Sequence, residues 1–372
     1  MFVAWRDLRF AKGRFTLMGT VIVLITLLVG LLSGLMAGLA RENVSAITAL
    51  PADRLAFAAP PAGRDVSFSD SSVPESAWRT WARQPGVTAA EPVGISTLNA
   101  AAGGTAATGD RRTGDAGDGR TGTVAVSVFG TEPDAGLAPE SGRLGPGKAV
   151  LSVSAAEELG VGAGDRIRLG SRNDVTVAAV AGDASYSHTP VVWTSLDDWR
   201  ALGHTGATVV ALRGGGIDVA AGDEAAGTRS TTVDEALGAI GSYRAENGSL
   251  QLMRGFLFVI SALVIGAFFT VWTIQRGGDV AVLKALGAST PYLLKDALGQ
   301  AVVVLGAGTL IGTGLAAGIG ALVGRGDVPF VLEPLTVLGP AAVTVALGLL
   351  GAALSIRRIA AVDPLTALGS AR

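Results

Sequence analysis

Residues 15–39, FTLMGTVIVLITLLVGLLSGLMAGL, form an apolar run without a single charged side chain. A helix needs about 20 such residues to cross the hydrocarbon core of a bilayer. The run is longer than the apolar region of a cleavable secretion signal, which spans about 7–15 residues. It therefore predicts a first membrane-spanning helix over residues 15–40.

Three further apolar stretches predict spans over residues 251–275, 293–323 and 334–356. Charged residues make up only 16% of the chain and hydrophobic residues 49%, whereas a soluble domain carries about 25% charged residues. The protein is therefore expected to be an integral membrane protein with four transmembrane helices. Its third span has small residues at two spacings that allow close helix contact, Gly308 with Gly312 and Gly314 with Gly318.

Basic residues flank the spans unevenly, which predicts the topology. They are Arg6, Arg9, Lys12 and Arg14 before the first span, Arg276, Lys284 and Lys295 between the second and third, and Arg357 and Arg358 after the fourth. Both termini and the middle loop should therefore be cytoplasmic. Residues 1–14 read as a helix lying on the inner membrane surface, and residues 357–372 as a cytoplasmic tail. The alanine- and glycine-rich composition is typical of a bacterial chain, which places these spans in the plasma membrane.

Residues 41–250 should then form one α+β extracytoplasmic domain, inserted between the first and second helices. Strands are expected over residues 124–129, 149–153, 166–169, 175–180 and 191–194. Short helices are expected over 154–159 and 195–202, each capped by its first serine, and over 232–240. Residues 100–123 contain no large apolar side chain and are expected to form a flexible loop.

No constellation typical of an enzyme is present. The absence of cysteine excludes disulfides, thiol nucleophiles and cysteine-ligated metals, and the net charge of −2 argues against a nucleic-acid partner. GRLGPGK, residues 142–148, has the spacing of a phosphate-binding loop but lacks the following hydroxyl residue, so it is interpreted as a turn leading into a strand. His188 and His204 have no carboxylate or second histidine at ligand spacing, which predicts two surface imidazoles and no metal site.

The loop between the second and third spans, residues 276–292, carries a short amphipathic helix. Val280, Leu283 and Leu286 share one face, Lys284 lies opposite, and Gly287 is placed to end the helix. From these residues alone, the helix is either a docking point for a soluble partner or an ordinary interfacial linker.

DVAVLKALGAS, residues 279–289, resembles the coupling-helix signature of MacB/FtsX-type ABC transporter permeases. The four-span layout with one large outward domain is similar to theirs. Residues 11–40, 45–53, 185–193, 242–260 and 357–369 resemble the branch that contains haem exporter permeases of the HrtB type and DevC-like permeases. One departure is Gly278-Asp279-Val280, where the superfamily often has Arg-Glu-Ile.

The resemblance implies a homodimer in the bilayer that works with two cytoplasmic ABC ATPase subunits. ATP would be bound by those partners, no intrinsic cofactor is implied, and haem is the implied substrate. The residues that would contact the ATPase are Asp279, Val280, Leu283, Lys284, Leu286 and Gly287.

Haem export of this type implies entry between the first two spans near the outer leaflet. The matching haem candidates are Met36, Asn43, Tyr243 and Met253, although the two methionines also suit plain helix packing and Tyr243 an interfacial position. Two alternatives remain: export of another amphiphile, such as a lipid, lipopeptide or antibiotic, and an FtsX-like relay that activates a cell-wall hydrolase.

Overall fold

The computed structural model describes residues 12–103, 123–171, 173–275, 278, 282, 284, 286–324 and 328–360. The chain forms two compact units, one comprising Met1–Leu39 with Gly248–Arg372 and the other Ala40–Asn247. Most of the predicted inner-surface helix over residues 1–14 and of the tail over 357–372 lies outside the described residues.

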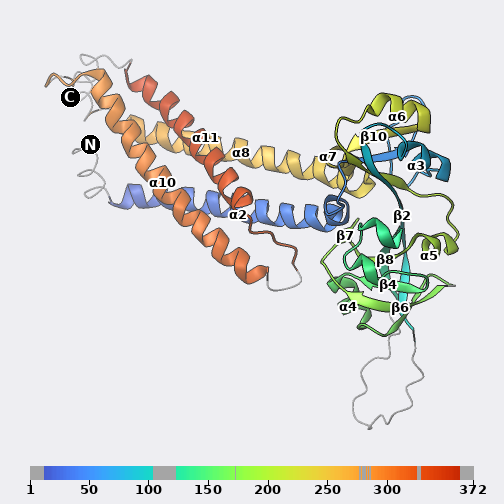
Figure 1. The fold of residues 1–372 in the computed structure, drawn as a ribbon. Coiled ribbons are helices and arrows are strands. Elements are labelled where there is room, and N and C mark those ends of the chain that lie inside the picture. Colours follow the sequence, from blue (N-terminus) through green and yellow to red (C-terminus); the bar gives the residue numbers. More distant parts are fainter. Residues whose placement is uncertain are drawn as a thin grey trace, which may run out of the picture. The chain divides into compact units, whose positions relative to one another are not determined.

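Four long apolar helices account for the predicted spans (Figure 1). They are α2 (Lys12–Thr48), α8 (Gly241–Gln275), α10 (Thr290–Val323) and α11 (Pro334–Ala360). This confirms the prediction of four membrane-length helices. Helix α2 continues past residue 40 and ends shortly before Pro51, because a proline disfavours helical backbone in the residue preceding it.

The core of the membrane unit is formed by side chains of α2, α8, α10 and α11 around Ile22, Phe269 and Leu305. Of the four glycines singled out in the third span, Gly308 and Gly312 lie against α2, as predicted. A Cβ atom built at Gly314 or Gly318 would meet no atom from another part of the described chain within 4 Å, so this pair does not make the close helix contact that its spacing allows within the chain. The spacing is the same, but the second pair lies on another face of the helix.

The outward unit is built on a ten-stranded mixed sheet in the order β10-β1-β9-β2-β3-β8-β4-β6-β5, with β7 paired to β8 (Figure 1). The strands are β1 (Arg54–Ala58), β2 (Val87–Ala102), β3 (Thr123–Thr131), β4 (Lys148–Leu151), β5 (Arg166–Leu169), β6 (Asn173–Val180), β7 (Ser185–Tyr186), β8 (Thr189–Ser195), β9 (Val209–Gly214) and β10 (Thr228–Thr232). The helices are α3 (Glu75–Trp81), α4 (Val153–Leu159), α5 (Leu196–Ala201), α6 (Val219–Ala226) and α7 (Val233–Ala236). The α+β prediction is confirmed.

All five predicted strands overlap β3, β4, β5, β6 and β8, and residues 142–148 lead into β4 as a turn. The strand predicted over 149–153 is too long, because β4 ends at Leu151 and Val153 already belongs to α4. One predicted cap is wrong: α4 is capped by Ser152, whose hydroxyl accepts a hydrogen bond from Ala155 N, rather than by Ser154. Ser195 does cap α5, as predicted. The prediction of a flexible loop over residues 100–123 is wrong at both ends, because Ala100 to Ala102 belong to β2 and Thr123 belongs to β3. Residues 104–122 lie outside the described chain.

Candidate substrate and coupling sites

The β7–β8 hairpin has a two-residue turn formed by Ser187 and His188, with φ of 52° and 61°. Such turns usually contain glycine or asparagine, because positive φ costs other residues about 1–2 kcal/mol each. Contacts outside the hairpin must therefore hold this backbone in place.

Those contacts come from the end of α2 and the start of α8. Asn43 O accepts a hydrogen bond from Ser187 N at 3.0 Å, and Glu42 O accepts one from His188 N at 3.3 Å. The imidazole Nε2 of His188 lies 2.8 Å from Glu246 Oε2, and its Nδ1 lies 3.7 Å from Glu42 Oε2. The hairpin tip is thus attached to both helices.

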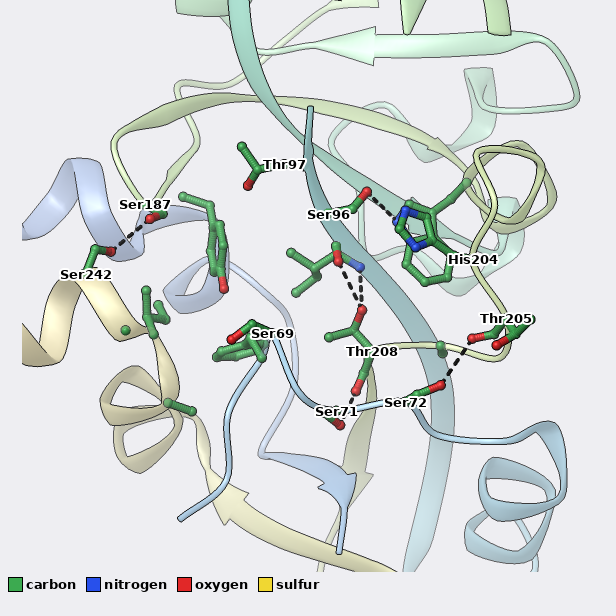
Figure 2. A pocket seen from close by; sticks show the side chains of 18 of the residues that line it. Ser69, Ser71, Ser72, Ser96, Thr97, Ser187, His204, Thr205, Thr208 and Ser242 are labelled. Carbon is green, nitrogen blue, oxygen red and sulfur yellow. Dashed lines mark hydrogen bonds between the residues drawn. The ribbon is translucent and has the colours of Figure 1, made fainter. Parts of the chain in front are cut away.

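Asn43 lies at the centre of these interactions and is 1% exposed. Its side-chain Oδ1 accepts a hydrogen bond from Ser242 Oγ at 2.8 Å, and its Nδ2 donates to Glu246 Oε2 at 3.2 Å. Ser242 Oγ also lies 2.9 Å from Ser187 Oγ (Figure 2). We call Glu42, Asn43, Ser187, His188, Ser242 and Glu246 the Asn43 cluster. It joins three segments that are far apart in the sequence.

The cluster was not predicted from the sequence. His188 occupies an exposed turn, as predicted, and two carboxylates that are distant in the sequence, those of Glu42 and Glu246, both reach it. His188 is 145 residues from Asn43 and 58 from Glu246, so no local spacing could reveal these contacts. In the described part of the chain no group of three His, Cys, Asp or Glu residues is arranged to hold a metal ion.

The four haem candidates lie in different surroundings. Met36 is buried and Met253 is half exposed, both in the membrane unit. Tyr243 is half buried and packs against the core of the outward unit. The side chain of Asn43 is committed to the Asn43 cluster. Tyr243 is the residue that follows Ser242 of the Asn43 cluster in the sequence.

The coupling segment is described at Gly278, Val282, Lys284 and from Leu286 onward. Leu286 N donates to Val282 O and Gly287 N to Lys284 O, and Gly287 has a φ of 97°. The prediction that Gly287 ends a short helix is therefore confirmed, because a left-handed residue at this position is typical of a helix end. Leu286 is 79% exposed. Asp279, Val280 and Leu283 lie outside the described residues.

The outward unit also contains a cavity of about 680 Å³ (Figure 2). Within the described chain, no Asp, Glu, Lys or Arg lines it, and nine of its lining residues are serines or threonines. His204 stacks on Trp199 with ring centroids 4.3 Å apart, and Trp199 Nε1 donates to Ser96 Oγ. Burial lowers the pKa of His204 and raises the pKa of Tyr186, so both line the cavity as neutral groups near pH 7.

This lowered pKa of His204 predicts a pH dependence of stability. The unfolded state takes up the proton first, near pH 6.5, so stability should fall as the pH drops below that value. When the pH is lowered from 7 to 5, the unfolding temperature of the full chain in detergent should fall less for His204→Gln than for the wild type. Equal losses in the two proteins would show that His204 does not contribute.

The comparisons with known proteins identify the family. Residues 15–228 match the family model of the MacB-like periplasmic core domain, and residues 252–364 match that of the FtsX-like permease C-terminal region. The chain belongs to the MacB/FtsX family of ABC transporter permeases. It is an ABC permease subunit.

Relatives of known name match parts of this permease. A putative hemin transport system permease protein HrtB of Staphylococcus epidermidis is 32% identical over 146 residues, which cover 38% of this chain and 41% of that protein. The match thus spans about two fifths of the relative's length. An uncharacterized ABC transporter permease of Mycobacterium tuberculosis is 27% identical over 263 residues, covering 67% of this chain and 71% of that one. The periplasmic region of MacB from Actinobacillus actinomycetemcomitans, at 10% identity, aligns with 51% of this chain and 92% of its own, with a TM-score of 0.34.

Proposed function

We propose that this permease forms a homodimer in the bacterial plasma membrane and, with two cytoplasmic ATPase subunits, exports haem from the membrane. The observation that carries the proposal is the 32% identity to a putative hemin transport permease. Both termini would be cytoplasmic, in line with the basic residues that flank the spans.

The coupling segment would receive the work of the ATPase. Val282 and Leu286 are exposed on either side of Lys284 and offer an apolar contact surface to a partner. ATP-driven closure of the ATPase pair would move this segment and the helices that flank it, α8 and α10. This movement would be a change between two conformations. Nucleotide would drive it because it binds the two conformations with different affinity.

The Asn43 cluster would take part in this switching. Residues of α2 and α8 both contribute to it, and the β7–β8 turn depends on it for support against positive φ. A rearrangement of either helix would therefore change the hairpin, and the hairpin would in turn restrict the helices. Tyr243, next to Ser242, would respond to the same change.

Haem binding tests the proposal. Purified permease in lipid nanodiscs is titrated with haem while the Soret band is followed, for the wild type, Tyr243→Phe and Met36→Leu. These substitutions keep the ring and the side-chain volume but remove the candidate ligand atoms. We expect saturable binding near one haem per dimer and an about tenfold weaker affinity in at least one variant, since a tenfold change corresponds to about 1.4 kcal/mol.

Tyr292→Phe is the matched control, because Tyr292 is a half-exposed tyrosine at the end of the coupling segment and not a haem candidate. Nonsaturable uptake that is the same in all four proteins would refute haem export. If haem does not bind and another amphiphile stimulates the ATPase, the result would support that amphiphile as the substrate instead.

A further inference from the structure

Strand β2 has an open edge in the middle of the sheet. Its pairing with β9 ends at Val93, and its pairing with β5 begins at Ala100. Between these points, only β3 pairs with β2 among the described residues, on the other side. An unpaired edge inside a ten-stranded sheet is unusual, because backbone donors and acceptors are normally paired.

Main-chain groups at both ends of this edge have hydrogen-bond partners. Ile95 N donates to Thr208 Oγ1 at 2.7 Å, and Ile95 O accepts from the same hydroxyl at 3.2 Å. Further along, Asn99 O accepts from Gly170 N at 2.9 Å. Because alternate residues of a strand direct their amide and carbonyl to the same side, Thr97 N–H and C=O also point to the open edge. Thr97 is exposed, and no strand pairs with it there.

The uncharged cavity opens onto this edge. Ile95, Ser96 and Thr97 line it together with the loop that carries His204 and Thr205 (Figure 2). Ser96 Oγ accepts the indole hydrogen of Trp199, so its own hydroxyl hydrogen remains to be donated. The cavity therefore offers one main-chain donor and one acceptor, surrounded by neutral hydrogen-bonding groups.

We propose that this cavity binds an extended, uncharged peptide segment, which pairs with β2 at Thr97. A peptide unit presents an N–H and a C=O in the spacing that Thr97 requires, and strand addition to an open edge is a common mode of peptide recognition. Charged side chains are excluded because the lining offers no counter-charge, and burying an unpaired charge is costly. None of the four haem candidates lines the cavity, although Ser242, which donates to Asn43 Oδ1, does. The proposal does not depend on what the permease exports.

The experiment selects ligands for the full chain in lipid nanodiscs from a displayed library of linear heptapeptides, with empty nanodiscs as counter-selection. The enriched peptide is synthesised with blocked ends, and its affinity is measured for three proteins. Thr97→Pro removes the amide hydrogen at the open edge, whereas Thr97→Val keeps that hydrogen and removes only the side-chain hydroxyl. We expect uncharged peptides, an about tenfold loss of affinity with Thr97→Pro, and a change of less than about twofold with Thr97→Val.

A second test changes only the peptide and uses the wild-type protein, so a folding defect in Thr97→Pro cannot affect its result. Methylation of single peptide nitrogens should reproduce the tenfold loss at one position along the peptide. The proposal is overturned if no peptide is enriched over empty nanodiscs. It is also overturned if neither Thr97→Pro nor methylation of the peptide nitrogens lowers the affinity of the enriched peptides. It is also overturned if diacetylchitobiose binds and requires Thr97 while no peptide does, since the site would then be one for a glycan.

Discussion

Asn43→Leu is expected to lower the unfolding temperature of the permease by about 10 °C. Leucine keeps the branched shape and the number of side-chain heavy atoms of asparagine but is larger, and it can neither accept the hydrogen bond from Ser242 Oγ nor donate one to Glu246 Oε2. The site is 1% exposed, so water cannot replace these bonds without rearrangement. A neutral and a charge-assisted hydrogen bond together contribute about 2–4 kcal/mol.

Thr48→Val is the matched control for Asn43→Leu. Thr48 lies on the same helix, is exposed, and bonds only to the carbonyls of Val44 and Ser45 within that helix. Its replacement should change stability by less than about 0.5 kcal/mol. Tryptophan fluorescence during heating measures both variants. Similar shifts for the two would mean that the Asn43 cluster adds no stability beyond an ordinary surface contact.

The membrane spans could be predicted from the sequence because lipid requires a continuous apolar run, which is a local property. Gly287 could be predicted for the same reason, since the end of a helix is decided by a few neighbouring residues. Strands β1, β2, β7, β9 and β10 were not predicted. Strand β10 reads TRSTT and has no apolar residue, so its place at the sheet edge comes from pairing with β1.

The Asn43 cluster and the open edge of β2 depend on contacts between distant segments. The sequence predicts His188 only as a surface imidazole, because its partners belong to two helices that no spacing rule connects with it. The two glycine pairs of α10 make the same point for packing. Their spacing indicates that close approach is possible, and only the structure shows which pair is used.

Gly312→Leu is expected to disrupt the contact between α2 and α10, whereas Gly314→Leu on the same helix should be tolerated. A Cβ atom at Gly312 would lie 2.7 Å from Val23 O, 2.8 Å from Thr26 Cβ and 3.2 Å from Leu27 N. Two of these atoms belong to the backbone of α2, so no side-chain rotation relieves the overlap and the helices must separate. Overpacking of this kind costs about 1–3 kcal/mol, and more where the backbone has to move.

Gly314 makes the comparison strict, since no atom of the described chain lies within 4 Å of the position where its Cβ would be. Leucine there adds side-chain volume without a clash and improves helix propensity by up to about 1 kcal/mol relative to glycine. Thermal unfolding and protease resistance in detergent should thus fall for Gly312→Leu and stay unchanged or rise for Gly314→Leu. If Gly314→Leu instead destabilises the permease as much as Gly312→Leu, then the second glycine face must contact another chain. The proposed homodimer would be the first place to look for that contact.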